Sequence, residues 1–146
     1  MKSFVALAAL AASAFAQRIQ IGVPANLAEI QPGSNITVEV DRPNSLTGST
    51  EVALAIGLFP CGGVKGATSC SSMDVSQVLG NVVYNGPYNP QYATDAPSKP
   101  PHQNFSVTVP STFQSGQVSL GVAHFSLVGA GQSPLYEFVN VTLVVP

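Results

Sequence analysis

The chain has 146 residues, of which 45% are hydrophobic and only 8% are charged, and its formal net charge is −2. Nucleic-acid-binding domains are usually basic along one face, so these counts exclude nucleic acid as a partner. The length suffices for one domain with a sizeable core and leaves no room for a second.

The first 16 residues predict a secretory signal peptide. Lys2 precedes an apolar stretch from Phe4 to Ala16 that ends in the small-x-small pattern accepted by signal peptidase. Thirteen apolar residues are too few to cross a bilayer, which takes about 20. We therefore predict cleavage after Ala16 and a secreted mature chain, residues 17–146, without a membrane span. The mature chain carries four basic and seven acidic residues.

Alternation of apolar and polar residues predicts two strands at the start of the mature chain. Residues 18–23 form the first, and residues 36–41 form the second after a turn at Pro32-Gly33. In the second strand Glu39 and Asp41 alternate with apolar positions. We expect these acids, like most of the seven, to face solvent.

Residues 51–59 are apolar at odd and even positions alike, which predicts a central strand covered on both faces. The two cysteines that follow, Cys61 and Cys70, predict one local disulfide in an oxidising compartment. We expect this bond to staple a loop rather than to hold the whole fold. Residues 73–79 favour one helical turn.

The least regular part of the chain is the long glycine- and proline-rich connection from Pro60 to Gln103. A short strand is predicted within it, at residues 81–84. Three tyrosines recur every four residues, Tyr84, Tyr88 and Tyr92. They are interpreted either as loop packing under the sheet or as an aromatic surface that contacts a partner protein or a sugar ring.

Three further strands are predicted in the last third of the chain. The first covers residues 104–109 and ends at Pro110. In residues 117–127 the apolar parity changes after Val122, which predicts a β-bulge near His124. Residues 136–145 form the last strand. About seven strands result.

Seven short strands with turn signals between them predict an all-β fold, a single immunoglobulin-like β-sandwich with one long Gly/Pro-rich loop. The chain has no tryptophan and its cysteines are too close to bridge two sheets, so we expect no antibody-type domain. Three glycosylation sequons begin at Asn35, Asn104 and Asn140. Each falls on or beside the polar side of its strand, so glycans there would point into solvent.

No pattern in the sequence indicates an active site. A dyad or metal site would need His102 and His124 to meet beside a carboxylate, and chance placement is the simpler interpretation. Paired carboxylates for glycoside hydrolysis would need two acids across a cleft, and only Asp74 and Asp95 on the long loop are open to that role. We therefore expect a non-enzymatic protein without a metal or a cofactor.

The mature chain resembles the fungal necrosis-inducing secreted protein family, which comprises small effectors of plant-associated fungi. The resemblance covers most of the mature chain and rests on Arg18-Ile19 and on the segments at residues 30–33, 52–57, 84–91, 104–110 and 124–131. It implies a non-enzymatic effector that contacts or enters plant tissue, interferes with receptor-associated immune kinases, and provokes cell death when abundant. It supplies no catalytic or contact residues.

Binding through an aromatic loop surface is the mechanism that the residues themselves favour, with Tyr84, Tyr88 and Tyr92 as anchors of an interface of about 800 Å² per partner. Addition of an edge strand to a partner's sheet is the other mode of binding. A rival hypothesis is a cell-wall carbohydrate-binding module whose tyrosines stack on sugar rings. A structural wall or adhesion protein is a third. We expect a monomer that acts outside the cell or in the host cytoplasm.

Overall fold

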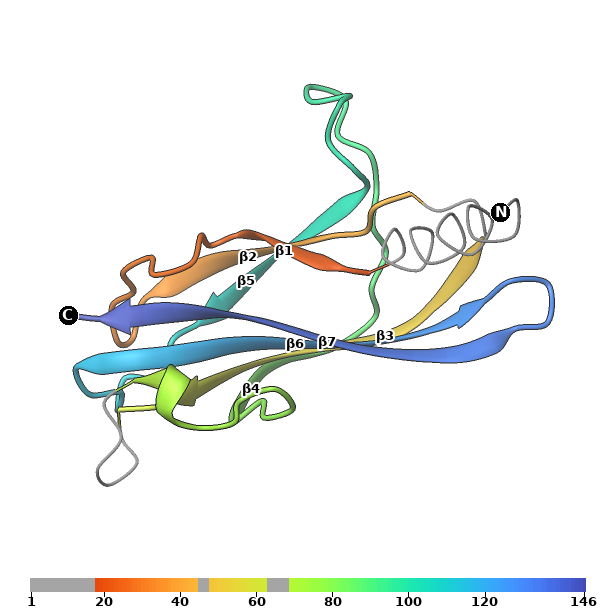
Figure 1. The fold of residues 1–146 in the computed structure, drawn as a ribbon. Helices are drawn as coiled ribbons and strands as arrows, with labels where there is room; N and C mark the ends of the chain where they lie inside the picture. The colour runs from red at the N-terminus through yellow and green to blue at the C-terminus, as the bar shows by residue number, and fades with distance from the viewer. Residues whose placement is uncertain (1–17, 45–47, 63–68) are drawn as a thin grey trace, which may run out of the picture.

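The structure of the chain is a computed structural model that describes residues 18–44, 48–62 and 69–146. The predicted signal peptide, its cleavage point after Ala16 and the first mature residue, Gln17, lie outside the described residues. The described chain forms two stacked antiparallel sheets (Figure 1). The first contains three strands in the order β1-β2-β5, and the second contains four strands in the order β4-β3-β6-β7.

The strands lie close to their predicted positions, and their bounds are β1 Gln20–Val23, β2 Asn35–Asp41, β3 Ser49–Pro60, β4 Asn81–Gly86, β5 His102–Thr108, β6 Gly116–Val128 and β7 Ser133–Val145. The all-β sandwich is thereby confirmed. The fourth strand pairs with β3, whereas the constant-type immunoglobulin domain places its fourth strand beside the fifth. The immunoglobulin-like subtype stays a prediction.

The core between the sheets consists of alternate residues of both, as the period of two requires. Val38 and Val40 of β2 face Leu54, Ile56 and Leu58 of β3, and all five are at most 1% exposed. The β2 strand begins after a turn in which Ser34 N–H donates to the carbonyl of Gln31 (3.1 Å). Proline followed by glycine at the centre of this turn, with Gly33 at φ 78°, matches a type II turn.

The prediction of a β-bulge near His124 is wrong. β6 pairs with β7 without a register shift from Gly116 to Val128, so His124 continues the inward parity of Val122 while Phe125, 37% exposed, faces outward. The bulge lies instead in the neighbouring strand β3, between Glu51 and Ala53. The extra residue there, Val52, is 46% exposed.

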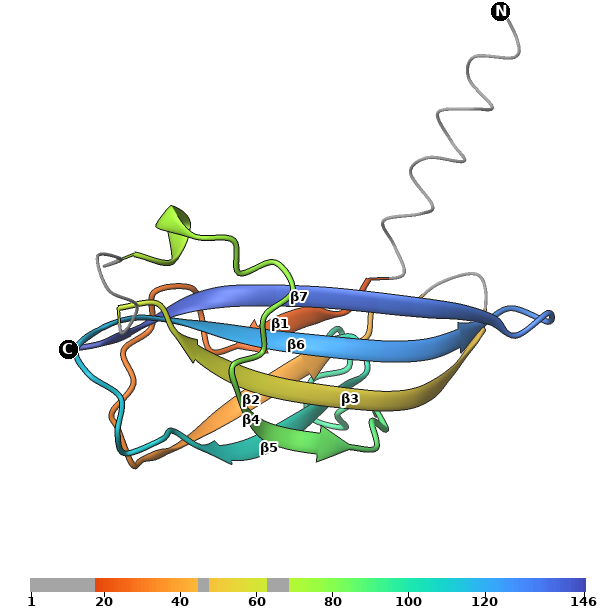
Figure 2. The same ribbon diagram turned by 90° about the horizontal axis from the view of Figure 1, so that it is seen from below.

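The chain's own segment after residue 72 crosses the outer face of the four-stranded sheet. Figure 2 shows this segment crossing β7, β6 and β3 before it becomes β4. It can lie so close because β3 carries Gly57 there, where a Cβ atom would come within 2.2 Å of the Leu79 carbonyl oxygen. The helical turn predicted at residues 73–79 is wrong, because a single 3₁₀ turn, η2 Cys70–Ser72, precedes them.

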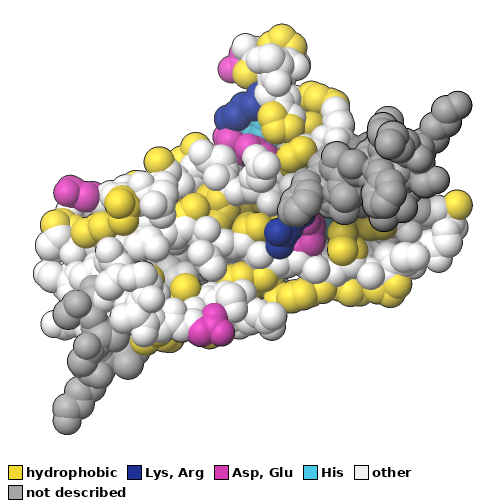
Figure 3. Space-filling view, in the orientation of Figure 1, with side chains coloured by type: hydrophobic (Ala, Val, Ile, Leu, Met, Phe, Trp, Pro, Cys, Tyr) yellow, Lys and Arg dark blue, Asp and Glu magenta, His cyan; other side chains and the backbone are white. Residues whose placement is uncertain are grey.

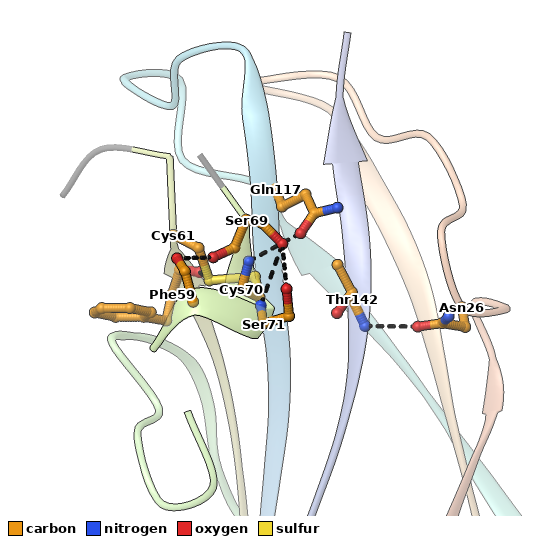
Figure 4. The surroundings of a disulfide bond; sticks show 9 residues. Asn26, Phe59, Cys61, Ser69, Cys70, Ser71, Gln117 and Thr142 are labelled. Carbon is orange, nitrogen blue, oxygen red and sulfur yellow. Dashed lines mark hydrogen bonds between the residues drawn. A yellow bond between two sulfur atoms is a disulfide. The ribbon is translucent and has the colours of Figure 1, made fainter. Parts of the chain in front are cut away.

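The predicted disulfide between Cys61 and Cys70 is confirmed, with Cα atoms 5.1 Å apart (Figure 4). It ties the end of β3 to η2, and both cysteines are buried. Two contacts dock this corner on β6: Cys70 N–H donates to Gln117 Oε1 (2.8 Å), and Cys61 N–H donates to the Gln117 carbonyl (2.8 Å). The bond thus fastens a local loop to the sheet.

Candidate functional site

A group of four charged side chains from four different segments meets inside the sandwich. His124 of β6 stands between two carboxylates, with Nδ1 3.0 Å from Glu137 Oε2 of β7 and Nε2 hydrogen-bonded to Glu51 of β3. Glu51 also accepts a hydrogen bond from Nε of Arg42 (3.2 Å), which directly follows β2. We call Arg42, Glu51, His124 and Glu137 the buried charge network.

Alternation along the strands places these side chains together. His124 and Glu137 are direct partners across β6 and β7, and antiparallel partners point to the same face. The bulge at Val52 turns Glu51 to the inner face as well, where it pairs with Ser126. If β3 were regular through Val52, Glu51 would share the outward parity of Ala53 and point into solvent.

Burial alone would lower the pKa of His124, but hydrogen bonds to Glu137 and Glu51 and their charges outweigh it and raise the pKa above its usual value of 6.5. For Glu51, burial would raise the pKa, yet hydrogen bonds to His124 and Ser49, with the charges of His124 and Arg42, lower it to about 2. Both shifts favour an ion pair between the protonated imidazole of His124 and the ionised carboxylate of Glu51.

This network is inaccessible to substrate at the imidazole, whose side chain is 0% exposed. The ring of Tyr88 covers it edge-on, with ring centroids 5.3 Å apart. A general base must come within hydrogen-bond reach of a substrate proton. The network thus links the end of β2 to β3, β6 and β7. Neither ring nitrogen of His124 is accessible to a substrate.

A hollow of about 310 Å³ opens on the outer side of the network. Its lining is mostly polar or proline: Arg42, Pro43, Asn44, Gly48, Ser49, Glu51, Asn89, Pro90 and Pro101. Ser49 accepts from Arg42 Nη2 and donates to Glu51 (both 2.8 Å), which holds that wall in place. Tyr92, 56% exposed, is hydrogen-bonded to Asn44 at this hollow.

Glu39 and Asp41 are buried, at 5% and 8% exposed, so the prediction that they face solvent is wrong. Lys99 of the long connection folds back onto them, with Nζ 2.7 Å from Glu39 Oε2. On the other side both carboxylates press against Gly22 of β1, where a Cβ would lie 2.4 Å from Glu39 Oε1. Figure 3 shows basic, acidic and histidine side chains meeting where the long connection leaves the sandwich.

Burial and the neighbouring Glu39 charge raise the pKa of Asp41, while for Glu39 the Lys99 ammonium outweighs burial and lowers the pKa. Lys99 is thus the cation that this acidic pair requires.

The three predicted contact tyrosines do not form one surface. Tyr88 is 4% exposed and donates to the Val40 carbonyl (3.0 Å), so it offers almost no area to a partner. Tyr84 is half-buried against Phe105, with ring centroids 4.5 Å apart. Loop packing describes these two, and Tyr92 is the exposed one. A contact role for Tyr84 and Tyr92 stays a prediction.

The other predicted site residues lie on the surface or apart from the network. Asp74 and Asp95 are exposed, and His102 is half-buried with Nδ1 2.9 Å from the Pro100 carbonyl. In residues 18–44, 48–62 and 69–146 no group of three His, Cys, Asp or Glu residues is arranged to hold a metal ion. No helix among these residues is long and apolar enough to span a membrane.

All three sequon asparagines, Asn35, Asn104 and Asn140, are exposed. Asn35 and Asn104 lie on β2 and β5 of one sheet, and Asn140 lies on β7 of the other. Their solvent exposure leaves all three accessible to a glycan, and glycosylation itself stays a prediction.

Sequence reasoning missed the buried charge network. One signal was available: polar His124 and Ser126 continue the inward alternation of Val118, Leu120 and Val122. Because inward positions were expected to be apolar, these two polar residues led to the prediction of a bulge in a strand that is regular. The position of Glu51 had no local signal, because it depends on a bulge in the partner strand.

Comparison with known proteins identifies a family. The model of the family described as Nis1 family matches residues 14–144, almost the whole chain and every strand of the sandwich except the last residue of β7. None of the curated proteins matches the chain.

Proposed function

The chain belongs to the Nis1 family, and from this we propose that it is a secreted, non-enzymatic effector of a plant-associated fungus. It binds receptor-associated immune kinases of the host and suppresses pattern-triggered immunity. At high abundance it induces host cell death. The family match over residues 14–144 carries this proposal.

The geometry is consistent with a protein that acts by binding. The one histidine held between two carboxylates has a fully buried side chain, which suits a role in stability better than one in catalysis. Exposed large apolar side chains remain on the surface, including Tyr92 and Tyr136, each 56% exposed. Tyrosines of this kind often anchor protein interfaces.

Secretion is part of the same proposal. It is supported by the apolar N-terminal stretch ending at Ala16 and by three sequons whose asparagines are all exposed. A disulfide, here Cys61–Cys70, is also typical of proteins that fold in an oxidising compartment.

A second candidate function is non-catalytic binding of cell-wall carbohydrate. The hollow of about 310 Å³ beside Arg42 favours it, because amide, hydroxyl and carboxylate groups suit sugar hydroxyls. Tyr92, hydrogen-bonded to Asn44 of the lining, is placed to stack on a ring. In this role the protein would stay in the fungal wall.

The test of the effector hypothesis is expression of the mature chain in leaf tissue, with and without a signal peptide. The oxidative burst after an elicitor and the kinases that co-purify with the chain are measured. We expect a weakened burst and recovery of receptor-associated kinases. A normal burst without recovered kinase would contradict the effector hypothesis.

Two tyrosine variants distinguish the effector from the carbohydrate-binding module. Tyr92→Ala and Tyr136→Ala remove side chains of equal exposure, 56%, at the polar hollow and on β7 respectively. Pull-down on insoluble wall polysaccharide that Tyr92→Ala abolishes and Tyr136→Ala leaves intact would favour the module. Absence of polysaccharide binding by the unaltered chain would exclude it.

A further inference from the structure

We propose that the free edge of β7, residues 134–140, docks one extended segment of a partner protein, which joins the four-stranded sheet as an additional strand. The identity of that partner, a receptor-associated kinase, rests on the proposed function. The position and mode of binding are inferred from the geometry of β7.

The chain itself already bonds to the end of this edge. Beyond β1, residues 26–30 begin in a turn in which Leu27 has φ 65°, and Glu29 then forms a parallel bridge with Val144 of β7. Leu27 N–H donates to the Thr142 carbonyl (2.6 Å), Ile30 N–H donates to the Val144 carbonyl (2.9 Å), and Val144 N–H donates to the Ala28 carbonyl (3.0 Å). Thr142 N–H donates to Asn26 Oδ1 (3.0 Å), as Figure 4 shows.

These bonds identify which residues of β7 direct their backbone outward from the sheet. Along an antiparallel pair, alternate residues bond to the partner strand and to the opposite side. Thr142 and Val144 bond outward, so Tyr136, Phe138 and Asn140 direct their N–H and C=O groups to the same edge. Among the described residues, no turn or loop backbone bonds to these three. Beyond the part of β7 that bonds to residues 26–30, this edge is therefore open at Tyr136, Phe138 and Asn140.

The open edge borders a hollow in the surface. This hollow of about 460 Å³ lies between β7 and the start of β1 and is lined by Arg18, Ile19, Gln20, Phe138, Val139 and Asn140. Figure 1 shows β1 and β7 as the neighbouring margins of the two sheets. A partner strand that pairs with residues 134–140 would enter at this hollow and continue the four-stranded sheet.

The open stretch of β7 carries only part of the usual protection of an edge strand. Natural edges often carry lysine, proline or inward charges that prevent pairing. Pro134 stands at the beginning, the inward Glu137 is hydrogen-bonded to His124 in the buried charge network, and residues 135–140 contain no lysine or proline. Exposed Tyr136 and its cross-strand partner Phe125 wall an apolar hollow of about 170 Å³ on the adjoining outer face. The matching partner is an extended segment that places an uncharged apolar residue beside Tyr136.

The test compares Asn140→Pro with Asn140→Ala. Both variants lose the side chain and the sequon, and only proline removes the edge-facing N–H. Proline is tolerated at edge positions whose N–H lies outside the ladder, so we expect both to fold. Against a purified receptor-associated kinase domain, Asn140→Pro should bind at least about tenfold more weakly than Asn140→Ala. Equal affinities would overturn the proposal.

Tyr136→Pro and Tyr136→Ala repeat the comparison should Asn140→Pro fail to fold. Hydrogen exchange on the unaltered chain measures directly whether the edge amides are protected in the complex. In the complex, amides of Tyr136, Phe138 and Asn140 should exchange at least about tenfold more slowly. A complex that leaves these amides unprotected would refute edge docking while the proposed function stands.

If the unaltered chain binds no kinase, the proposed function fails and a peptide tests the edge alone. The probe copies residues 24–31, the chain's own segment beside the end of β7, and is titrated into the isotope-labelled mature chain. Amide shifts centred on residues 134–140 would support the docking edge, and Asn140→Pro should weaken them. No shift at these residues at millimolar peptide would overturn it.

Discussion

At the scale of single residues, His124 is the centre of the buried charge network. It is 1% exposed and lies between Glu51 and Glu137. Removing one partner of a buried ion pair leaves an uncompensated charge, which costs about 3–5 kcal/mol. Stability should therefore depend on the charge of this imidazole more than on that of exposed groups.

We predict a stability maximum between about pH 4.5 and 6.5. The pKa of His124 is raised in the folded state, so its contribution is complete below its unfolded value near 6.5 and is lost as pH rises through the folded value. The pKa of Glu51 is lowered to about 2, so its contribution is complete above its unfolded value near 4.5 and is lost as pH falls towards 2. Urea unfolding from pH 3 to 9 measures both limbs.

His124→Gln should lower the free energy of unfolding at pH 5.5 by about 3–5 kcal/mol and abolish the decline above pH 6.5. His102→Gln, which alters a half-buried histidine outside the network, should keep the profile of the unaltered chain. A decline above pH 6.5 that persists in His124→Gln would assign the titration to another group.

At the scale of elements, most strand positions could be predicted because one face is apolar and the other polar, and that of β3 because residues 51–59 are apolar on both faces. Local details that depend on a partner strand could not. The bulge at Val52 is needed to match β3 to β6, and neither strand shows that by itself. Likewise, the covered outer face of β3 depends on residues 78–80, distant in sequence from Gly57.

Gly57→Ala should destabilise the sandwich by about 1–3 kcal/mol, because the new methyl group would meet the Leu79 carbonyl and force the crossing segment away. Gly48→Ala is the matched control, since a Cβ there has nothing within 4 Å. It should leave stability unchanged or raise it by up to about 1 kcal/mol. Equal unfolding midpoints for the two variants in urea would contradict the close packing of this segment.

The disulfide is a second stabilising feature at the scale of elements. Replacing both Cys61 and Cys70 by serine should lower the free energy of unfolding by about 2–3 kcal/mol, as expected for so short a loop. The far-ultraviolet circular dichroism of the sheet should not change, because the bond fastens η2 and the end of β3. Loss of the sheet signal in the double variant would show that the bond holds the whole fold.

At the scale of the whole molecule, alternation and turn residues suffice to predict a seven-stranded sandwich, since each strand reports its own burial pattern. The surface is harder to predict. Tyr88 and Tyr92 lie four residues apart in one loop, yet one is 4% and the other 56% exposed, because only Tyr88 folds under β2. Which aromatic residues face a partner is decided by three-dimensional packing.

The central claim is that this Nis1-family sandwich acts by binding a kinase. Isothermal titration of the mature chain, residues 17–146, into the purified kinase domain of a receptor-associated immune kinase tests it most directly, with soluble wall polysaccharide as the comparison ligand. We predict one-to-one saturation by the kinase with a Kd below about 10 μM and no heat with polysaccharide. Saturation by polysaccharide with none by the kinase would contradict the claim and establish the carbohydrate-binding alternative.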